Sequence, residues 1–171
     1  MLVFFDDILV YSMTWEELLA HLDIVLGILG NESLYAKESK CDLGMKKLLY
    51  LGHILSVEGV RMDLDKVKAI FEWPTPMNPT QIRGFLGLCG FFHRFVNGYS
   101  HHAAPLTDLT KKGAFVWTRE AQECFEMFKR LMTTCPVLAL SDFTKPFELQ
   151  CDTLGEGIGA ILMQDKHSMA Y

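Results

Sequence analysis

Two adjacent aspartates interrupt a strand-like stretch near the start of the chain, in the sequence LVFFDDILVYS. Asp6 and Asp7 stand between two apolar runs, residues 2–5 and 8–11. Adjacent carboxylates repel each other and are costly to bury, so this pattern predicts a turn between two strands. Two interpretations stay open here. The pair either occupies a plain solvent-exposed turn, or it forms a hairpin tip that presents carboxylate oxygens to divalent metal ions.

The sequence predicts a helix directly after this hairpin. Thr14 and Glu17 have the spacing of a capping box, and Gly30-Asn31 is a typical end of a helix. Between these signals six apolar residues repeat at helical spacing. They are Leu18, Leu19, Leu22, Val25, Leu26 and Leu29. Residues 33–41 and 48–56 are predicted as short strands, and Gly52 within the second indicates a bulge or a close backbone approach.

Three further helices are indicated by their capping residues. Asp63 can cap a short helix that Pro74 and Pro76 end. Asn78 is followed by Pro79 at the first helical position, a typical beginning of a longer helix. Its expected apolar stripe is Ile82, Phe85, Leu86, Cys89 and Val96. The stretch HHAAPLTDLTKKGAF is predicted to be an irregular connector, and Thr118 is expected to begin the next helix. The apolar residues expected on one side of that helix are Ala121, Cys124, Phe125, Phe128, Leu131 and Met132.

The C-terminal stretch FELQCDTLGEGIGAILMQ alternates like a strand, turns through Gly155 and Gly157, and becomes apolar again. This pattern predicts a β-hairpin that opens a new domain.

Composition limits the classes of protein that remain. The chain has 171 residues, of which 50% are hydrophobic, enough for the core of one domain or two small ones. The five cysteines are widely spaced and include no C-x-x-C pair, so neither a disulfide framework nor a zinc site is indicated. No run has the length of a membrane helix and no signal peptide is recognisable, so we expect an intracellular protein and not a secreted one.

Charge is unevenly distributed along the chain. The net charge of −5 argues against a simple nucleic-acid binder. Residues 1–33, however, hold six acids and no Lys or Arg, whereas residues 76–114 hold four basic residues and only one acid. This division is compatible with a metal-binding end and a phosphate-facing segment, although such runs are usually just solvated faces.

Six sequence segments occur in a fixed order that resembles a known family. They are FFDDILVYS, LYAKESKC, YLGHILS, WPTPMNPTQIRGFLGLCGFFHRFVNGYS, FVWTREAQECFEMFK and PVLALSDFTKPFELQCD. The series resembles the reverse transcriptase of gypsy-type LTR retrotransposons, a part of their Pol polyprotein, over essentially the whole chain.

The resemblance implies an α+β fold in four parts. Residues 1–60 would be the C-terminal part of the polymerase palm, built of antiparallel hairpins and a helix. Residues 61–105 would form the helical thumb, and residues 106–143 a connecting segment with a helix. Residues 144–171 would begin a ribonuclease H-like domain as a truncated β-hairpin. The fingers and the first palm strands, including the palm strand that bears the family's other metal-binding aspartate, would lie upstream, so we expect the sequence to be a fragment.

By this resemblance the aspartate pair becomes a candidate catalytic site. In a reverse transcriptase the aromatic-x-Asp-Asp tip projects its carboxylates toward two Mg²⁺ ions at the primer end and the incoming nucleotide. Asp6 would be the principal ligand and Asp7 its neighbour. Lys40, in KESKC, matches a lysine that lies near the leaving pyrophosphate in related polymerases and could act as a general acid. It is equally compatible with an ordinary surface lysine.

The family's hairpin that grips the primer strand matches Leu51-Gly52-His53. Gly52 would let the backbone approach nucleic acid closely. His53 is a candidate contact to the primer, with an ordinary strand-face histidine as the alternative.

Helical spacing provides an independent argument for a nucleic-acid face. Arg83, Gly87 and Phe91 are four residues apart and share one side of the predicted thumb helix. A glycine between a cation and an aromatic ring could follow the minor groove of a duplex, as the matching helix of relatives does. The alternative is that Gly84, Gly87 and Gly90 permit close packing of helices.

Asp152 matches the first carboxylate of the ribonuclease H metal site. The family usually continues Asp-Ala-Ser, whereas this chain has Asp152-Thr153-Leu154, which puts that site in doubt. The other acidic ligands would lie beyond Tyr171, and Glu156 is not one of them. No ribonuclease activity is therefore expected from this chain alone.

The resemblance implies a segment of an RNA-directed DNA polymerase that uses Mg²⁺. Its partners would be an RNA template, a DNA primer, the RNA–DNA hybrid, deoxynucleotides in the full enzyme and the rest of the Pol polyprotein, with no membrane. Its expected location would be the cytoplasm, in a virus-like particle, or the nucleus. As an isolated chain we expect it to be inactive. The alternative function is a non-catalytic nucleic-acid-binding relic of a decayed retroelement.

Overall fold

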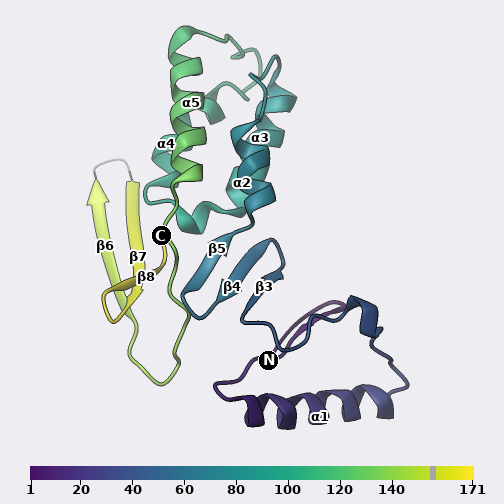
Figure 1. Ribbon diagram of the computed structural model, residues 1–171. Helices are drawn as coiled ribbons and strands as arrows, with labels where there is room; N and C mark the ends of the chain where they lie inside the picture. The colour runs from purple at the N-terminus through teal and green to yellow at the C-terminus, as the bar shows by residue number, and fades with distance from the viewer. Residues whose placement is uncertain (155–156) are drawn as a thin grey trace. The chain divides into compact units, whose positions relative to one another are not determined.

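The computed structural model describes residues 1–154 and 157–171 and divides into two compact units, residues 1–50 and 51–171. The first unit contains β1 (Leu2–Phe4), β2 (Asp7–Leu9), α1 (Trp15–Asn31), the 3-10 turn η1 (Glu38–Lys40) and β3 (Lys47–Tyr50). The second contains β4 (His53–Ser56), β5 (Gly59–Met62), α2 (Leu64–Phe71), α3 (Pro79–Phe91), η2 (His93–Phe95), α4 (Tyr99–Asp108), α5 (Arg119–Thr133), β6 (Glu148–Leu154), β7 (Gly157–Gln164) and β8 (His167–Ala170) (Figure 1). Helices combined with small antiparallel sheets confirm the predicted α+β class.

Helix α1 begins at the predicted capping box. The Thr14 hydroxyl accepts a hydrogen bond from the Glu17 amide at 3.2 Å, and the Glu17 carboxylate accepts one from the Thr14 amide at 3.3 Å. These two bonds satisfy backbone donors that the first turn leaves without helical partners.

The first unit, all of whose residues are described, has a very small core. Leu9 is its only buried hydrophobic side chain, at 8% exposure. On α1 the half-buried stripe is narrower than predicted and consists of Leu18, Leu22, Val25 and Leu29. Leu19 and Leu26 were expected on the same stripe, but they are 50% and 55% exposed. Spacings of three and four residues define one face, and these two leucines lie one position off it.

The prediction of a strand over residues 33–41 is wrong. The structure has an irregular segment there that ends in η1, where the Lys37 carbonyl accepts hydrogen bonds from the Lys40 amide and the Cys41 thiol. This local bonding replaces the ladder that a strand would need. The predicted strand 48–56 is divided in two, because Leu51 and Gly52 both have positive φ, 47° and 72°, and form a turn between β3 and β4.

The helices of the second unit begin at the predicted residues. The side chain of Asp63 caps α2, that of Asn78 caps α3, and that of Thr118 caps α5. Pro79 occupies the first turn of α3, where its missing amide costs no hydrogen bond.

Aromatic rings from separate helices form the core of the second unit. Phe85 of α3 is fully buried, and its ring centroid lies 4.7 Å from that of Phe125 and 6.0 Å from that of Phe128, both on α5. The buried residues of this cluster are Val60, Met62, Ile70, Ile82, Phe85, Cys89, Phe92, Phe95, Val96, Ala103, Leu106, Phe125, Phe128, Met132 and Leu138. Lys129 is also buried; its ammonium donates to the Trp73 carbonyl at 3.0 Å.

The irregular connector predicted for residues 101–115 is in fact helical over its first half. Residues Tyr99–Asp108 form α4, which contains Pro105. The helix buries Ala103 and Leu106 in the core, and that burial outweighs the local preference of the sequence for turns.

The C-terminal hairpin is confirmed. Strands β6 and β7 pair antiparallel from Glu148↔Met163 to Leu154↔Gly157, and β8 adds a third strand that was not predicted. Of the predicted turn, Gly155 and the following Glu156 lie outside the described residues.

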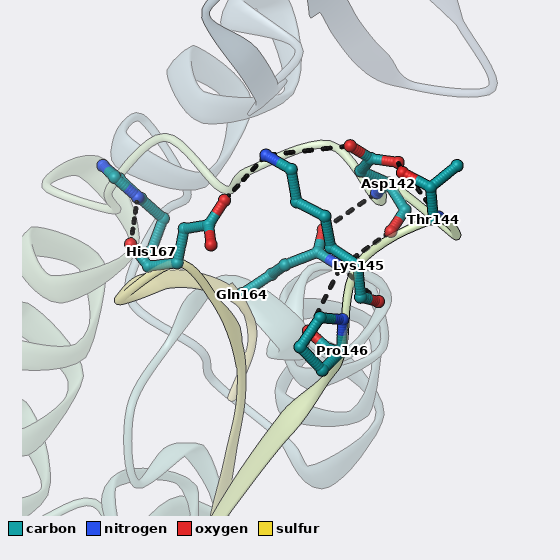
Figure 2. A network of polar contacts seen from close by, with 7 residues as sticks. Asp142, Thr144, Lys145, Pro146, Gln164 and His167 are labelled. Atoms are coloured by element: carbon teal, nitrogen blue, oxygen red, sulfur yellow. Dashed lines mark hydrogen bonds and ion pairs between the residues drawn. The ribbon is translucent and has the colours of Figure 1, made fainter.

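A buried amide holds the segment before this sheet in place (Figure 2). Gln164 is 4% exposed, and its Nε2 donates to the carbonyls of Asp142 and Lys145 at 2.8 and 3.2 Å. Its Oε1 accepts from the Asp142 amide at 2.9 Å. The Lys145 ammonium lies 2.8 Å from the Asp165 carboxylate, which joins the same segment to the end of β7.

Candidate functional site

The aspartate pair lies at the tip of an antiparallel hairpin. Strands β1 and β2 pair in the register Leu2↔Leu9, Val3↔Ile8 and Phe4↔Asp7, so Phe5 and Asp6 form the two-residue turn. Both carboxylates are exposed. The tip predicted from the sequence is therefore present, and Asp7 begins the returning strand.

The turn has an unusual backbone at its first residue. Phe5 has a φ of 52°, a conformation that glycine normally adopts at this position of a two-residue hairpin loop. A bulky residue there is strained by about 1–3 kcal/mol, and such residues cluster at functional sites. The Phe5 ring is 87% exposed and makes an edge contact with Phe4 at 4.9 Å between centroids.

The chemistry of the tip suits hard divalent cations, which prefer carboxylate oxygens. Within the described residues, no three His, Cys, Asp or Glu side chains gather closely enough to hold a metal ion. The hairpin thus offers two oxygen-bearing side chains and would need further ligands from elsewhere to complete a coordination shell.

Lys40 ends η1, and its side chain is exposed. Its amide donates to the Lys37 carbonyl at 2.8 Å. In this fully described unit no hydrogen bond or ion pair joins the Lys40 ammonium to Asp6 or Asp7, so the structure does not bring this candidate general acid into contact with the pair.

Three of the candidate nucleic-acid residues meet in the second unit. A Cβ placed on Gly52 would lie 3.3 Å from a ring carbon of Phe91. The His53 ring lies 5.3 Å from that of Phe91, centroid to centroid. The turn before β4 therefore packs on the end of α3, and Phe91 still leaves 54% of its surface exposed.

The other two candidates lie on α3 itself. Arg83 is exposed, and its guanidinium donates to the Thr110 carbonyl at 2.7 Å, which ties α3 to the turn after α4. Gly87 is exposed, and an added Cβ would meet nothing within 4 Å in the described part of the chain. Packing of helices does not require a glycine at Gly87, whereas Gly84 lies 3.5 Å from Trp73 by the same measure.

Asp152 lies in β6 opposite Gly159 of β7, and its side chain is exposed. It is far along the chain from the aspartate pair and belongs to a separate sheet.

Sequence reasoning missed residues that support the Gly52–His53 turn. Phe92 and Phe95 pack on the His53 ring at 5.6 and 5.7 Å, and the Arg94 guanidinium donates to the Met169 carbonyl at 3.4 Å. The signal was present as the aromatic run FFHRF, residues 91–95, which begins at the last residue of α3 and continues past the helix.

Several known proteins are similar to this chain in sequence. A family model for the ribonuclease H-like domain found in reverse transcriptase matches residues 117–171. An uncharacterized mitochondrial protein of Arabidopsis thaliana, AtMg00860, is 46% identical over 129 residues, which are 74% of this chain and 82% of that protein. The Pol polyprotein of transposon 297 of Drosophila melanogaster is 35% identical over 99% of this chain, and that of transposon gypsy 30% identical over 95%. The chain spans only 16% and 17% of these two polyproteins.

Two solved structures have a fold similar to that of this chain. A foamy viral protease-reverse transcriptase in complex with double-stranded DNA matches 94% of this chain and 29% of its own, with a TM-score of 0.85 and 21% identity. The same viral protein in complex with an RNA/DNA hybrid matches 94% of this chain and 23% of its own, with a TM-score of 0.83 and 22% identity.

The chain has the fold of the matching segment of a reverse transcriptase, and its residues 117–171 match a ribonuclease H-like domain found in such enzymes. Over nearly its whole length the chain is similar to a segment of retrotransposon Pol polyproteins, with a gypsy-type element among these relatives, and this confirms the resemblance seen in the sequence.

Proposed function

We propose that this chain is the segment of an RNA-directed DNA polymerase that supplies carboxylates to the metal site and grips the primer–template duplex. The observation that carries the proposal is the hairpin tip, where two exposed aspartates follow a strained aromatic residue, Phe5, with a φ of 52°. Glycine or asparagine is the usual residue at a turn position with positive φ, so a strained aromatic residue there supports a functional tip.

Asp6 and Asp7 would hold the Mg²⁺ ions of such a site. When bound, these ions activate the attacking hydroxyl and neutralise charge on the leaving pyrophosphate. Asp6 lies in the turn of the hairpin, where its flanking residues are paired across the two strands. The isolated chain should not polymerise DNA, since the described residues offer no third carboxylate near the pair.

The second unit would hold the nucleic acid. Gly87 leaves an open path on the exposed side of α3, between the Arg83 guanidinium and the Phe91 ring. A path without side chains lets the backbone of a helix approach a duplex closely, while Arg83 can contact phosphate and Phe91 can contact sugar or base. The RNA/DNA hybrid bound to the foamy viral relative supports a hybrid as the ligand of this face.

Asp152 would supply one carboxylate of a ribonuclease H-type metal site. Its neighbours Thr153 and Leu154 depart from the family pattern, and no metal-binding cluster of three acids, histidines or cysteines forms around it in the described residues. We therefore assign no ribonuclease activity to this chain by itself.

A second candidate function is nucleic-acid binding without catalysis, as in a retained relic. The aspartate pair and the α3 face are widely separated along the chain, so one could function without the other. The alternative would hold if the second unit binds a hybrid and the tip binds no metal. Both can be measured separately.

The proposed contact between α3 and the duplex is tested by measuring how the full chain binds a fluorescent RNA–DNA hybrid at several salt concentrations. Arg83→Gln keeps a donor for the Thr110 carbonyl but removes the charge. We expect weaker binding and a fall of about 0.9 in the slope of log affinity against log salt, the value of one phosphate contact. Arg130→Gln removes the same charge from the exposed side of α5 and should leave the slope unchanged. Equal effects of the two substitutions would contradict the proposed face.

A further inference from the structure

His53 points into the second unit and lies among aromatic rings. Its ring centroid is 5.3, 5.6 and 5.7 Å from those of Phe91, Phe92 and Phe95, and the last pair is stacked. A residue held in this way offers little of its ring to a ligand. Its position differs from that of an exposed contact to the primer strand.

One hydrogen bond determines the tautomer of the imidazole. His53 Nδ1 lies 2.8 Å from the Leu51 carbonyl oxygen, and a carbonyl only accepts, so Nδ1 must carry the proton. Nε2 is then a bare acceptor. It is buried and has no hydrogen-bond partner among the described residues.

The surroundings keep this ring neutral. Burial, chiefly, and the nearby Arg94 guanidinium lower the pKa of His53 below 6.5, although the hydrogen bond to Leu51 opposes them. A proton on Nε2 would be a donor without an acceptor, next to a cation.

The turn that this bond closes is otherwise unfavourable. Leu51 has a φ of 47°, which is strained for a bulky residue, and Gly52 has a φ of 72° with a Phe91 ring carbon 3.3 Å from the position that a Cβ would occupy. The Gly52 carbonyl accepts from the Asp63 amide at 3.2 Å, so the turn is also tied to the beginning of α2.

We propose that His53 is a positioning residue: as the Nδ1-protonated neutral tautomer it fixes the Leu51–Gly52 turn against the end of α3, so that this turn and Phe91 present one continuous surface to the duplex. The role in duplex binding rests on the proposed function, whereas the role in holding the turn does not. His53 itself does not contact nucleic acid.

His53→Phe is the informative substitution, because it keeps an aromatic ring among the three phenylalanines and removes the donor to Leu51, the one hydrogen bond that the imidazole makes in the described residues. Without that bond the turn should open more often, and exchange of the Asp63 amide, which bonds to Gly52, should rise about tenfold. Exchange of the Ile70 amide in α2 is the control for general loss of structure and should not change.

The tautomer is measured directly by ¹⁵N NMR of the imidazole in the full chain at pH 7. We expect a protonated Nδ1 and a bare Nε2, unchanged when an RNA–DNA hybrid binds. A protonated Nε2, or unchanged Asp63 exchange in His53→Phe, would overturn the inference.

Binding separates this inference from the proposed function. If the wild-type chain binds the hybrid, His53→Phe should bind it several-fold more weakly, and equal binding would overturn the positioning role. If the wild-type chain does not bind the hybrid, the proposed function fails, while the tautomer and the Asp63 exchange still decide whether His53 holds the turn.

Discussion

At the scale of single residues, the proposed metal site depends on the aspartate pair at the hairpin tip. Asp6 and Asp7 are exposed, and the turn is held in a conformation that Phe5 adopts only at a cost. The sequence predicted the position of the tip because adjacent carboxylates cannot be buried. It could not predict the left-handed conformation of Phe5, since nothing in its side chain favours a positive φ.

Metal binding at the tip can be measured without any activity. Addition of Mn²⁺, a paramagnetic substitute for Mg²⁺, should broaden the NMR signals of the Phe5, Asp6 and Asp7 amides, because the carboxylates supply oxygen ligands. Asp6→Asn should abolish this broadening. Asp23→Asn, at an exposed position of α1, is the control and should leave it intact.

His53 predicts how stability depends on pH. Its pKa is lower in the folded protein than its ordinary value of 6.5, so below pH 6.5 the unfolded chain binds more protons than the folded one. The contribution of His53 to the free energy of unfolding is therefore complete above pH 6.5, and it decreases as the pH falls through and below that value. Chemical denaturation between pH 7.5 and 5 should show a smaller loss of stability in His53→Phe than in wild type. The same loss in both would contradict the lowered pKa.

At the scale of secondary-structure elements, the sequence predicted where helices begin better than it predicted what lies between them. Side chains cap α1, α2, α3 and α5 at the predicted residues because these caps depend on neighbours within four positions. Helix α4 was missed because its Ala103 and Leu106 are held by distant parts of the core. For the same reason the meeting of Gly52, His53 and Phe91 could not be derived from spacing alone.

Helix α3 provides a test of its proposed nucleic-acid face. Gly87→Ala should raise the unfolding free energy by about 0.5–1 kcal/mol, since alanine favours helix and the site is open. It should also weaken binding of the RNA–DNA hybrid, because a methyl group then blocks the close approach. Gly27→Ala in α1, equally open, is the matched control and should leave binding unchanged. A Gly87→Ala protein that binds as well as wild type would show that the duplex does not follow this face.

At the scale of the whole molecule, the two units differ in how much apolar surface they bury. The second has a core of aromatic rings, whereas in the first, which is described throughout, only Leu9 is buried. So little burial leaves a unit of this size close to marginal stability. Residues 1–50 should therefore gain most from the additional chain that the longer Pol relatives possess.

Restoration of polymerase activity tests the central claim most directly. The chain is joined to the preceding part of the transposon 297 polyprotein, and extension of a primed RNA template is measured with Mg²⁺. The account predicts extension by this chimera, none by the isolated chain, and a loss of at least about a hundredfold in the Asp6→Asn chimera, since displacement of the reacting atoms by about 1 Å already costs that much. Asp23→Asn should extend normally. Extension by the Asp6→Asn chimera at the unsubstituted rate, or by the isolated chain, would contradict the account.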